Sequence, residues 1–389
     1  MLFREVIGNE DLKKRLLSSI QEGRISHAQL FLGPEGCGNL PMALAYAQYL
    51  NCENRTPEDA CGTCASCQKA QKFIHPDIHF TFPFIVAGDK KEDRREKCAD
   101  WLPEWRQFLS ENPYGNYQSW IRYSGNESKQ GNINAKECHE IIHRLSFKTF
   151  ESTYKILILW LPEFLEKEGN RLLKLIEEPP DNTVFLMVGH NPDRILNTIL
   201  SRLQTVRFAR LSDKDLASAL EEKEGLTAAS AQQIAILSNG NFSRAMELLH
   251  VADSGMTREL QQWLRWCNRP GRQEIFNWIN DFVKQPKEQQ KAFFNYGMHV
   301  GREVMLIQSG AQQLNRLTEG EIQLVTGLAK VLTPEATSQL IQLFDRYTYL
   351  IERNANSKIM MTQMSVTLMR LFRGVPASPL PAVFNDADM

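Results

Sequence analysis

The pattern of apolar and polar positions predicts a chain that changes character partway along. Apolar runs at 28–33, 155–161 and 183–189 are typical of buried strands, and 203–211 is expected to contain a further strand. Between them lie segments whose apolar residues recur every three or four positions, as in helices. One such helix is expected to start at Asn9, as its N-cap, and to stop at Gly23. A second is expected over 166–180. Strands that alternate with helices predict an α/β fold with a parallel sheet covered on both faces.

From Ser212 onward the strand pattern disappears and helical periodicity continues. A chain of 389 residues has room for two or three domains, each with its own core. The expected core residues of the last part are Trp263, Trp266, Phe276 and Trp278. The expected boundaries are 1–211 for the α/β domain, 212–253 for a small helical domain, 254–374 for a helical C-terminal domain and 375–389 for a Pro-rich, poorly ordered tail.

Residues 80–131 form a segment that fits neither pattern. It is dense in aromatic residues and includes a run of mixed charge at 89–97. Aromatic side chains pack inside proteins more often than they line a surface, so we expect a partly ordered insertion with a small core of its own. A platform on which nucleic-acid bases stack is the alternative. The aromatic residues are Trp101, Trp105, Phe108, Tyr114, Tyr117, Trp120 and Tyr123.

Composition and charge indicate which class of protein this is. The chain is 42% hydrophobic and 23% charged, as ordinary globular proteins are. It contains no apolar run of about 20 residues, and its first residues carry charges too early for a signal peptide, so a cytoplasmic protein is expected. The net charge of −1 supplies no global basic field for nucleic acid. Any DNA contact would therefore be local or shared with partner subunits.

Four of the eight cysteines lie close together, separated by eight, two and two residues. In a reducing compartment such cysteines serve as thiols or metal ligands rather than as disulfides. Four thiolates complete a closed tetrahedral zinc site, which is structural because no position stays open for a catalytic water. Unligated thiols and an iron–sulfur cluster are the alternatives. The predicted ligands are Cys52, Cys61, Cys64 and Cys67, whereas Cys37, Cys98, Cys138 and Cys267 are isolated.

The turn after the first apolar run is similar to a phosphate-binding loop. Gly33, Gly36 and Gly38 lie between a predicted strand and a predicted helix. Phosphate-binding loops occur in this context. A nucleotide-hydrolysing loop continues with Lys and then Ser or Thr, which reach the outer phosphates and hold magnesium. This sequence has Asn39 and Leu40 instead. Two interpretations stay open, a turn without a ligand and a weak nucleotide site.

The second apolar run also lacks catalytic residues. An ATPase of this architecture ends that strand with acids that hold magnesium and polarise water. Here the run ends in Leu159–Pro162 and the first acid is Glu163, displaced by two or three residues. Two independent catalytic elements are therefore missing.

Arg202 precedes the last predicted strand, in the segment "NTILSRLQTVRF". Its guanidinium could reach a phosphate bound by a neighbouring subunit, as an arginine finger does. A surface salt bridge is the usual fate of a lone Arg, and the local sequence alone favours it.

Together these motifs resemble one family. The segments "HAQLFLGPEGCGN", the cysteine cluster, "HPD" at 75–77, "LLKLIEEPP" and "ILSRLQ" follow one another in an order similar to that of the bacterial DNA polymerase III clamp-loader subunits of the AAA+ superfamily. The resemblance spans residues 3–250 and is interrupted by the aromatic insertion. "LLKLIEEPP" together with the cysteine cluster is much more specific than the glycine turn.

The resemblance implies an AAA+ P-loop-type sheet domain, a small helical lid and an all-α collar that holds a five-subunit ring together. The sequence is most similar to the delta-prime type, which keeps the fold but often lacks ATPase competence; it has "SRL" where that type has "SRC". By this resemblance Arg202 enters the ATP site of an adjacent motor subunit, and the four cysteines bind zinc. Arg244 corresponds to the second-sensor arginine, and Gly189–Asn191 lie near the first-sensor position. If the nucleotide site is empty, these residues have no phosphate to contact.

The implied function is that of a non-hydrolysing subunit of the DNA polymerase III holoenzyme, which helps to load the sliding clamp onto primed DNA. The implied partners are gamma/tau-like motor subunits, a delta-like subunit, the clamp and, through the assembly, primer–template DNA. Two alternatives are an active ATPase of the same superfamily and a stand-alone zinc-stabilised DNA-binding protein.

Overall fold

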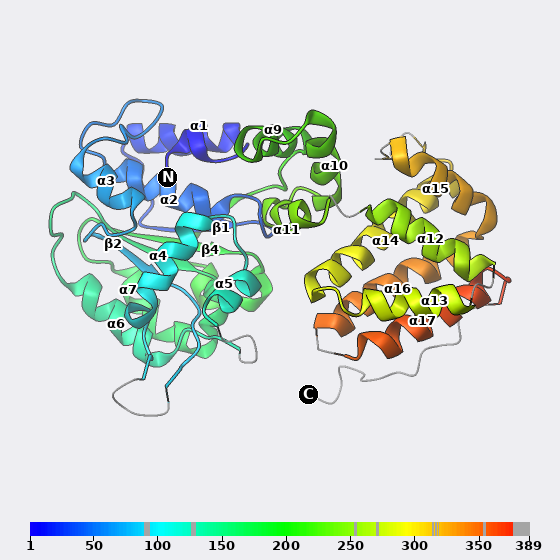
Figure 1. The fold of residues 1–389 in the computed structure, drawn as a ribbon. Helices are drawn as coiled ribbons and strands as arrows, with labels where there is room; N and C mark the ends of the chain where they lie inside the picture. Colours follow the sequence, from blue (N-terminus) through cyan, green and yellow to red (C-terminus); the bar gives the residue numbers. More distant parts are fainter. Residues whose placement is uncertain are drawn as a thin grey trace. The chain divides into compact units, whose positions relative to one another are not determined.

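The molecule consists of a first part built around a parallel sheet and a second, helical part. This computed structural model describes residues 1–88, 94–125, 130–252, 255–269, 272–312, 315, 317, 319–352 and 355–375. Most of the predicted tail and part of the charge run at 89–97 lie outside these residues. The chain divides into two compact units, Met1–Arg244 and Ala245–Met389 (Figure 1).

Five strands form the sheet of the first unit, in the order β2-β3-β4-β1-β5, and every neighbouring pair is parallel. The three central strands are buried along their whole length, which explains their continuous apolar runs. Because the strands are parallel, the segments that follow them meet at one edge. The strands are β1 (Ala28–Leu32), β2 (Ile78–Thr81), β3 (Lys155–Trp160), β4 (Thr183–Gly189) and β5 (Gln204–Arg207).

Helices cover this sheet, and α2 packs against β1, β3 and β4 with all of its residues buried. The helix predicted over 166–180 is only partly formed. Its first half is a 3-10 helix, and a short α-helix ends before Pro179 and Pro180. The α-helices are α1 (Glu10–Gln21), α2 (Asn39–Leu50), α3 (Ala65–Gln71), α6 (Ala135–Ser146), α7 (Leu173–Glu177) and α8 (Asn197–Leu200); the 3-10 helices are η1 (Phe3–Glu5), η2 (Cys98–Trp101), η3 (Pro162–Phe164), η4 (Glu166–Leu172) and η5 (Pro192–Arg194).

The described part of the aromatic insertion contains the α-helices α4 (Leu102–Glu111) and α5 (Tyr117–Tyr123), which follow η2. The expected separate core is instead continuous with the core of the sheet domain. Trp105 stacks on Phe82 with ring centroids 4.2 Å apart and lies 5.1 Å from Trp160 at the end of β3. Trp101, Trp105, Phe108, Tyr114 and Trp120 are buried. Their burial favours packing over a base-stacking platform.

Helices make up the rest of the described chain. In the first unit, α9 (Asp213–Glu224) and α10 (Ala228–Ser238) pack against each other and lead into α11 (Phe242–Ala252). We call residues 212–244 the lid. The second unit contains α12 (Met256–Asn268), α13 (Arg272–Phe282), α14 (Lys287–Gln308), α15 (Glu319–Val331), α16 (Pro334–Glu352) and α17 (Ser357–Leu371). None of the described helices is long and apolar enough to cross a membrane.

The core of the second unit contains Trp263, which stacks on Trp278 and donates a hydrogen bond from Nε1 to the Ser365 hydroxyl at 3.0 Å. The prediction that Phe276 is a core residue is wrong, because its side chain is 52% exposed. The buried face of α13 is formed by Ile275, Ile279 and Phe282, which are spaced one helical turn apart. The predicted fold class is confirmed: an α/β domain with a parallel sheet, followed by helices.

Candidate functional site

The glycine turn, residues 33–38, joins β1 to α2 at the carboxyl edge of the sheet. Gly36 and Gly38 adopt φ values of +68° and +92°, in the left-handed region that favours glycine. The Cys37 sulfur packs against Gly33, 2.7 Å from where a Cβ would stand. Burial raises the pKa of the Cys37 thiol to about 11, so the turn holds a neutral thiol.

The Asn39 side chain forms hydrogen bonds with the protein backbone. Its side chain is 3% exposed, and Nδ2 donates to the Gly189 carbonyl at 3.1 Å and to the Phe31 carbonyl at 3.4 Å. Its Oδ1 accepts from the Leu40 N–H at 3.0 Å. These bonds tie together the carboxyl ends of β1 and β4. Leu40 is also buried, and its side chain has no oxygen. Neither side chain therefore supplies a positive charge for a phosphate or a free ligand for magnesium.

Glu163, the first acid after β3, is also engaged by backbone. One carboxylate oxygen, Oε1, accepts the N–H of His190 at 2.5 Å and that of Asn191 at 2.8 Å. His190 Nδ1 lies 2.9 Å from the Gly33 carbonyl, so this nitrogen carries the proton. The structure thus brings Gly189–Asn191, the segment expected near a first-sensor position, to the glycine turn. The position that would carry a magnesium acid at the end of β3 is Trp160, buried against the insertion.

The lid docks on the glycine turn. The Phe242 N–H donates to the Gly36 carbonyl at 3.1 Å, and Asn241 Oδ1 occupies the space where a Gly36 side chain would stand. Arg244 lies in the first turn of α11, and its N–H donates to Asn241 Oδ1 at 3.1 Å. A side chain at position 36 would push the lid away, which is why this position requires glycine.

Two contacts at this turn were not predicted from the sequence. Asn9 precedes α1 as expected, but its side chain accepts no capping hydrogen bond; Nδ2 donates instead to the Cys37 carbonyl at 3.1 Å. Tyr114 of the insertion lies beside Gly38 and its hydroxyl accepts the Ile7 N–H at 2.7 Å. The density of aromatic residues in the insertion was the only signal for the second contact.

The four predicted metal ligands come together between α2 and α3. The sulfur atoms of Cys52, Cys61, Cys64 and Cys67 all lie within 4.8 Å of one another. Zn–S bonds of about 2.3 Å place the sulfurs of a tetrahedron about 3.8 Å apart, and the Cys61 and Cys67 sulfurs are 3.9 Å apart. The donor set and its spacing therefore fit a structural zinc ion, and the four cysteines form a possible metal site.

Backbone N–H groups point at these sulfurs, as they do around thiolates. The Cys61 N–H donates to the Cys52 sulfur and the Cys64 N–H to the Cys61 sulfur, each at 3.3 Å. Backbone hydrogen bonds from Thr63 and Cys64 lower the pKa of the Cys61 thiol to about 6. Burial acts in the opposite direction on Cys67 and raises its pKa. A cation among the four sulfurs would compensate for this cost of burying charge.

Arg202 lies on the surface at the opposite edge of the sheet. It precedes β5, whose Gln204 pairs with Gln29 near the start of β1. The four residues of β5 span about 13 Å, so Arg202 stands far from the glycine turn of its own chain. Its Nε donates to Glu177 Oε1 at 2.6 Å. The two side chains are 33% and 47% exposed, and an ion pair this exposed is weak.

The "HPD" motif has a structural role. His75 is buried, and its Nε2 lies 3.0 Å from the hydroxyls of both Ser66 and Ser152. Asp77 is buried too, and its carboxylate accepts three successive backbone N–H groups, from residues 150–152, at 2.6 to 2.9 Å. The motif therefore fixes the loop that leads into β3.

Replacing Asp77 with Ala is expected to lower the free energy of unfolding by about 3 kcal/mol, because three N–H groups lose their acceptor. Urea denaturation followed by circular dichroism measures the change. The exposed Asp193 supplies the matched control, since its replacement by Ala should change stability by less than about 0.5 kcal/mol. Equal stability of the two variants would show that the motif is not structural.

Comparisons with known proteins show which family this chain belongs to. The family model described as DNA polymerase III, delta subunit, matches residues 8–212. The DNA polymerase III subunit delta' of Bacillus subtilis (strain 168) is 27% identical over 235 residues, which cover 60% of this chain and 57% of that protein. Subunit tau of the same organism is 26% identical over 262 residues, 65% of this chain and 38% of that protein.

A solved structure, that of a DNA polymerase III gamma subunit-related protein from Thermotoga maritima, aligns with a TM-score of 0.40 and 14% identity, over 94% of this chain and 100% of that one. The matched segments thus span less than two thirds of the length of either Bacillus subtilis subunit. The family model, in contrast, matches more than half of this chain. The chain therefore belongs to the DNA polymerase III delta subunit family of clamp-loader subunits.

Proposed function

We propose that this chain is a delta-prime-like, non-hydrolysing subunit of the DNA polymerase III clamp loader. The observation that carries the proposal is the state of the glycine turn. Asn39 bonds to the backbone of β1 and β4, Trp160 replaces an acid at the end of β3, and the carboxylate of Glu163 accepts two backbone N–H groups. Each catalytic element is absent, while the P-loop-type fold around it is kept.

The surface arginine supports a role in a neighbouring subunit. Arg202 stands at the amino edge of the sheet and cannot serve the glycine turn of its own chain, which lies at the carboxyl edge. The guanidinium is held at the surface by the ion pair with Glu177 and by the Thr198 carbonyl, to which Nη1 donates at 2.6 Å. Both partners are exposed to solvent, so the guanidinium can exchange them for a phosphate at little cost. We therefore assign to Arg202 the role of an arginine finger in the ATP site of an adjacent motor subunit.

The cysteine cluster supports a structural zinc site in the same unit. A zinc ion held by Cys52, Cys61, Cys64 and Cys67 would cross-link the segment between α2 and α3. Asp59 within this segment accepts the N–H groups of Phe3 and Arg4 at 3.0 and 3.1 Å. The ion would in this way also order the N-terminal segment that approaches the glycine turn.

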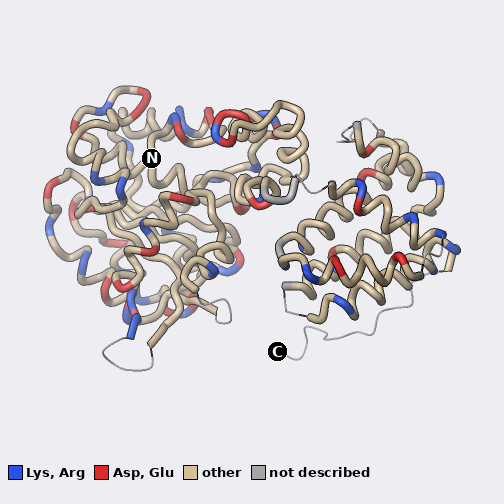
Figure 2. Tube along the Cα trace, viewed as in Figure 1, with Lys and Arg blue, Asp and Glu red and all other residues tan. Residues whose placement is uncertain are grey.

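The partners follow from this assignment. They are gamma/tau-like motor subunits and a delta-like subunit in a hetero-pentameric ring, the sliding clamp, and primer–template DNA held by the whole assembly. Basic and acidic residues alternate along both units (Figure 2), which favours a DNA contact shared with other subunits over a stand-alone DNA-binding protein.

Titration calorimetry of the purified chain tests the loss of nucleotide chemistry. Mg-ATP is expected to bind no more tightly than about 1 mM, because the turn has no charge for the outer phosphates and no ligand for magnesium. The double variant Asn39→Lys, Leu40→Thr should still not hydrolyse ATP, since Trp160 remains at the end of β3. Micromolar binding with turnover by the natural chain would support the alternative, an active ATPase of the same superfamily.

A further inference from the structure

Tyr114 fills the space between the glycine turn and the lid. Its side chain is 3% exposed, and one ring carbon lies 3.3 Å from where a Cβ on Gly38 would stand. The hydroxyl accepts the Ile7 N–H at 2.7 Å, across 107 positions of the sequence. One ring of the insertion therefore contacts the turn and the N-terminal segment at the same time.

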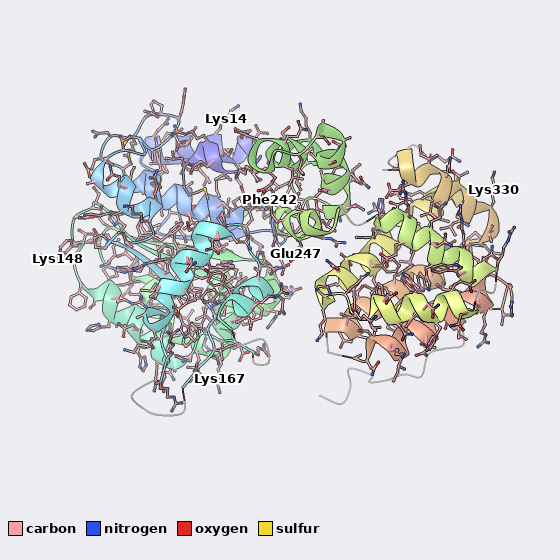
Figure 3. All side chains as sticks on the ribbon, viewed as in Figure 1. Lys14, Lys148, Lys167, Phe242, Glu247 and Lys330 are labelled. Atoms are coloured by element: carbon pink, nitrogen blue, oxygen red, sulfur yellow. The ribbon has the colours of Figure 1, made fainter. Side chains whose placement is uncertain are left out.

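The lid closes on the other side of this ring. The ring centroids of Tyr114 and Phe242 are 4.8 Å apart, and Phe242 is the residue whose N–H donates to the Gly36 carbonyl. Figure 3 shows Phe242 at the start of α11. The Lys223 ammonium of α9 lies 5.7 Å from the centroids of both rings, within reach of a cation–π interaction. The lid thus supplies one ring of this aromatic pair from α11 and a cation beside both rings from α9.

The insertion holds Tyr114 on a rigid support. Tyr114 lies in the short connection between α4 and α5, where the Gly115 N–H donates to the Asn112 carbonyl at 2.9 Å. A side chain at Gly115 would collide with the Phe108 ring at 2.4 Å, so the connection packs tightly onto α4. Phe108 and its neighbour Trp105 pack in turn on Trp160 at the end of β3. The position of Tyr114 is therefore set by the core of the sheet domain.

We propose that Tyr114 is a built-in occupant of the nucleotide-type site, a latch that holds the lid on the glycine turn in the absence of nucleotide. The Tyr114 ring lies in a slot beside Gly38 that is bounded by the Phe242 ring, the Ile7 N–H donor and the Lys223 ammonium. These groups also suit a purine base, whose ring nitrogens accept hydrogen bonds. In this chain the ring and the accepting oxygen come from Tyr114, so the slot is closed to purine nucleotides. The latch itself does not depend on the proposed function; only its use within a ring of subunits does.

Hydrogen exchange of the full chain, without nucleotide or partners, tests the latch. In Tyr114→Ala we expect amide exchange at least about tenfold faster in residues 6–8, 36–38 and 241–244 and in α9, since these segments lose their common contact. Tyr114→Phe keeps the ring and removes the hydroxyl, so exchange should rise mainly at the Ile7 amide. Phe150→Ala is the control: it removes an aromatic side chain of the same unit that is 79% exposed and should leave these segments unchanged.

The latch is overturned if a folded Tyr114→Ala protein protects the glycine turn and the lid as well as the natural chain does. If this variant fails to fold, Tyr114→Phe decides: a change confined to the Ile7 amide supports the latch, and an unchanged Ile7 amide contradicts it. Both measurements use the isolated chain, so they do not depend on whether it assembles with ATPase subunits.

Discussion

Replacing Arg202 with Ala is expected to lower the DNA-stimulated ATP hydrolysis of a reconstituted clamp-loader complex while this chain stays folded and assembled. An arginine finger stabilises charge that develops on the transferred phosphoryl group, and its removal lowers the rate at that site about 10³-fold or more. The complex should therefore lose at least the share of its steady-state rate that the adjacent site supplies. The isolated chain should lose little stability, because the half-buried Arg202 side chain makes its ion pair with Glu177 and its hydrogen bond to the Thr198 carbonyl at the surface, where both are weak.

Arg171 supplies a matched control for this experiment. It is an exposed arginine on the same domain, and its Nε lies 2.7 Å from Glu168 Oε2. Arg171→Ala should leave the hydrolysis rate of the complex unchanged. Arg202→Lys should recover little activity, because an ammonium cannot reproduce the planar fork of a guanidinium. If the complex with Arg202→Ala hydrolyses ATP at the normal rate, the finger assignment is wrong.

Loss of the metal is expected to have the second large effect. Stripping zinc with a strong chelator, or replacing both Cys61 and Cys64 with Ser, should lower the midpoint of thermal unfolding of the first unit by about 10 °C. Four thiols held close together without a cation repel one another once they ionise, and the segment between α2 and α3 loses its cross-link. Differential scanning calorimetry measures the midpoint, and elemental analysis should find one zinc per natural chain.

The double cysteine variant is also the control for the chelator, which should not lower its midpoint further. A colourless, metal-free natural protein with the same midpoint before and after chelation would contradict the metal assignment. Iron, together with visible absorbance from the four-cysteine site, would identify an iron–sulfur cluster instead.

The central strands could be predicted because burial on both faces leaves a direct mark on the sequence. β1, β3 and β4 read as continuous apolar runs, and the structure places them as predicted. β2 was missed because it has four residues, with His79 and Thr81 among them. The helix predicted at 166–180 followed a sound periodicity, but Gly169 approaches Ile199 closely and the first half is a 3-10 helix.

The candidate site was predictable only where the chemistry is local. The cysteine cluster and the departures at Asn39 and Leu40 can be read from short segments. The bonds that occupy Asn39 and Glu163 join strands far apart in the sequence, and the contact of Tyr114 with Ile7 joins residues 107 positions apart. Periodicity and motifs carry no information on such pairs, so the filled slot at the glycine turn became visible only in the folded chain.

Purification of the tagged full chain from its own cells, followed by native mass spectrometry, tests the central claim most directly. We expect a complex of fixed stoichiometry with gamma/tau-like ATPase subunits, whose DNA-dependent ATP hydrolysis falls when this chain is left out of a reconstitution, while this chain alone hydrolyses no ATP. Recovery of the chain alone, or ATP hydrolysis by the isolated chain, would contradict the claim that it is a non-hydrolysing subunit that serves a neighbour.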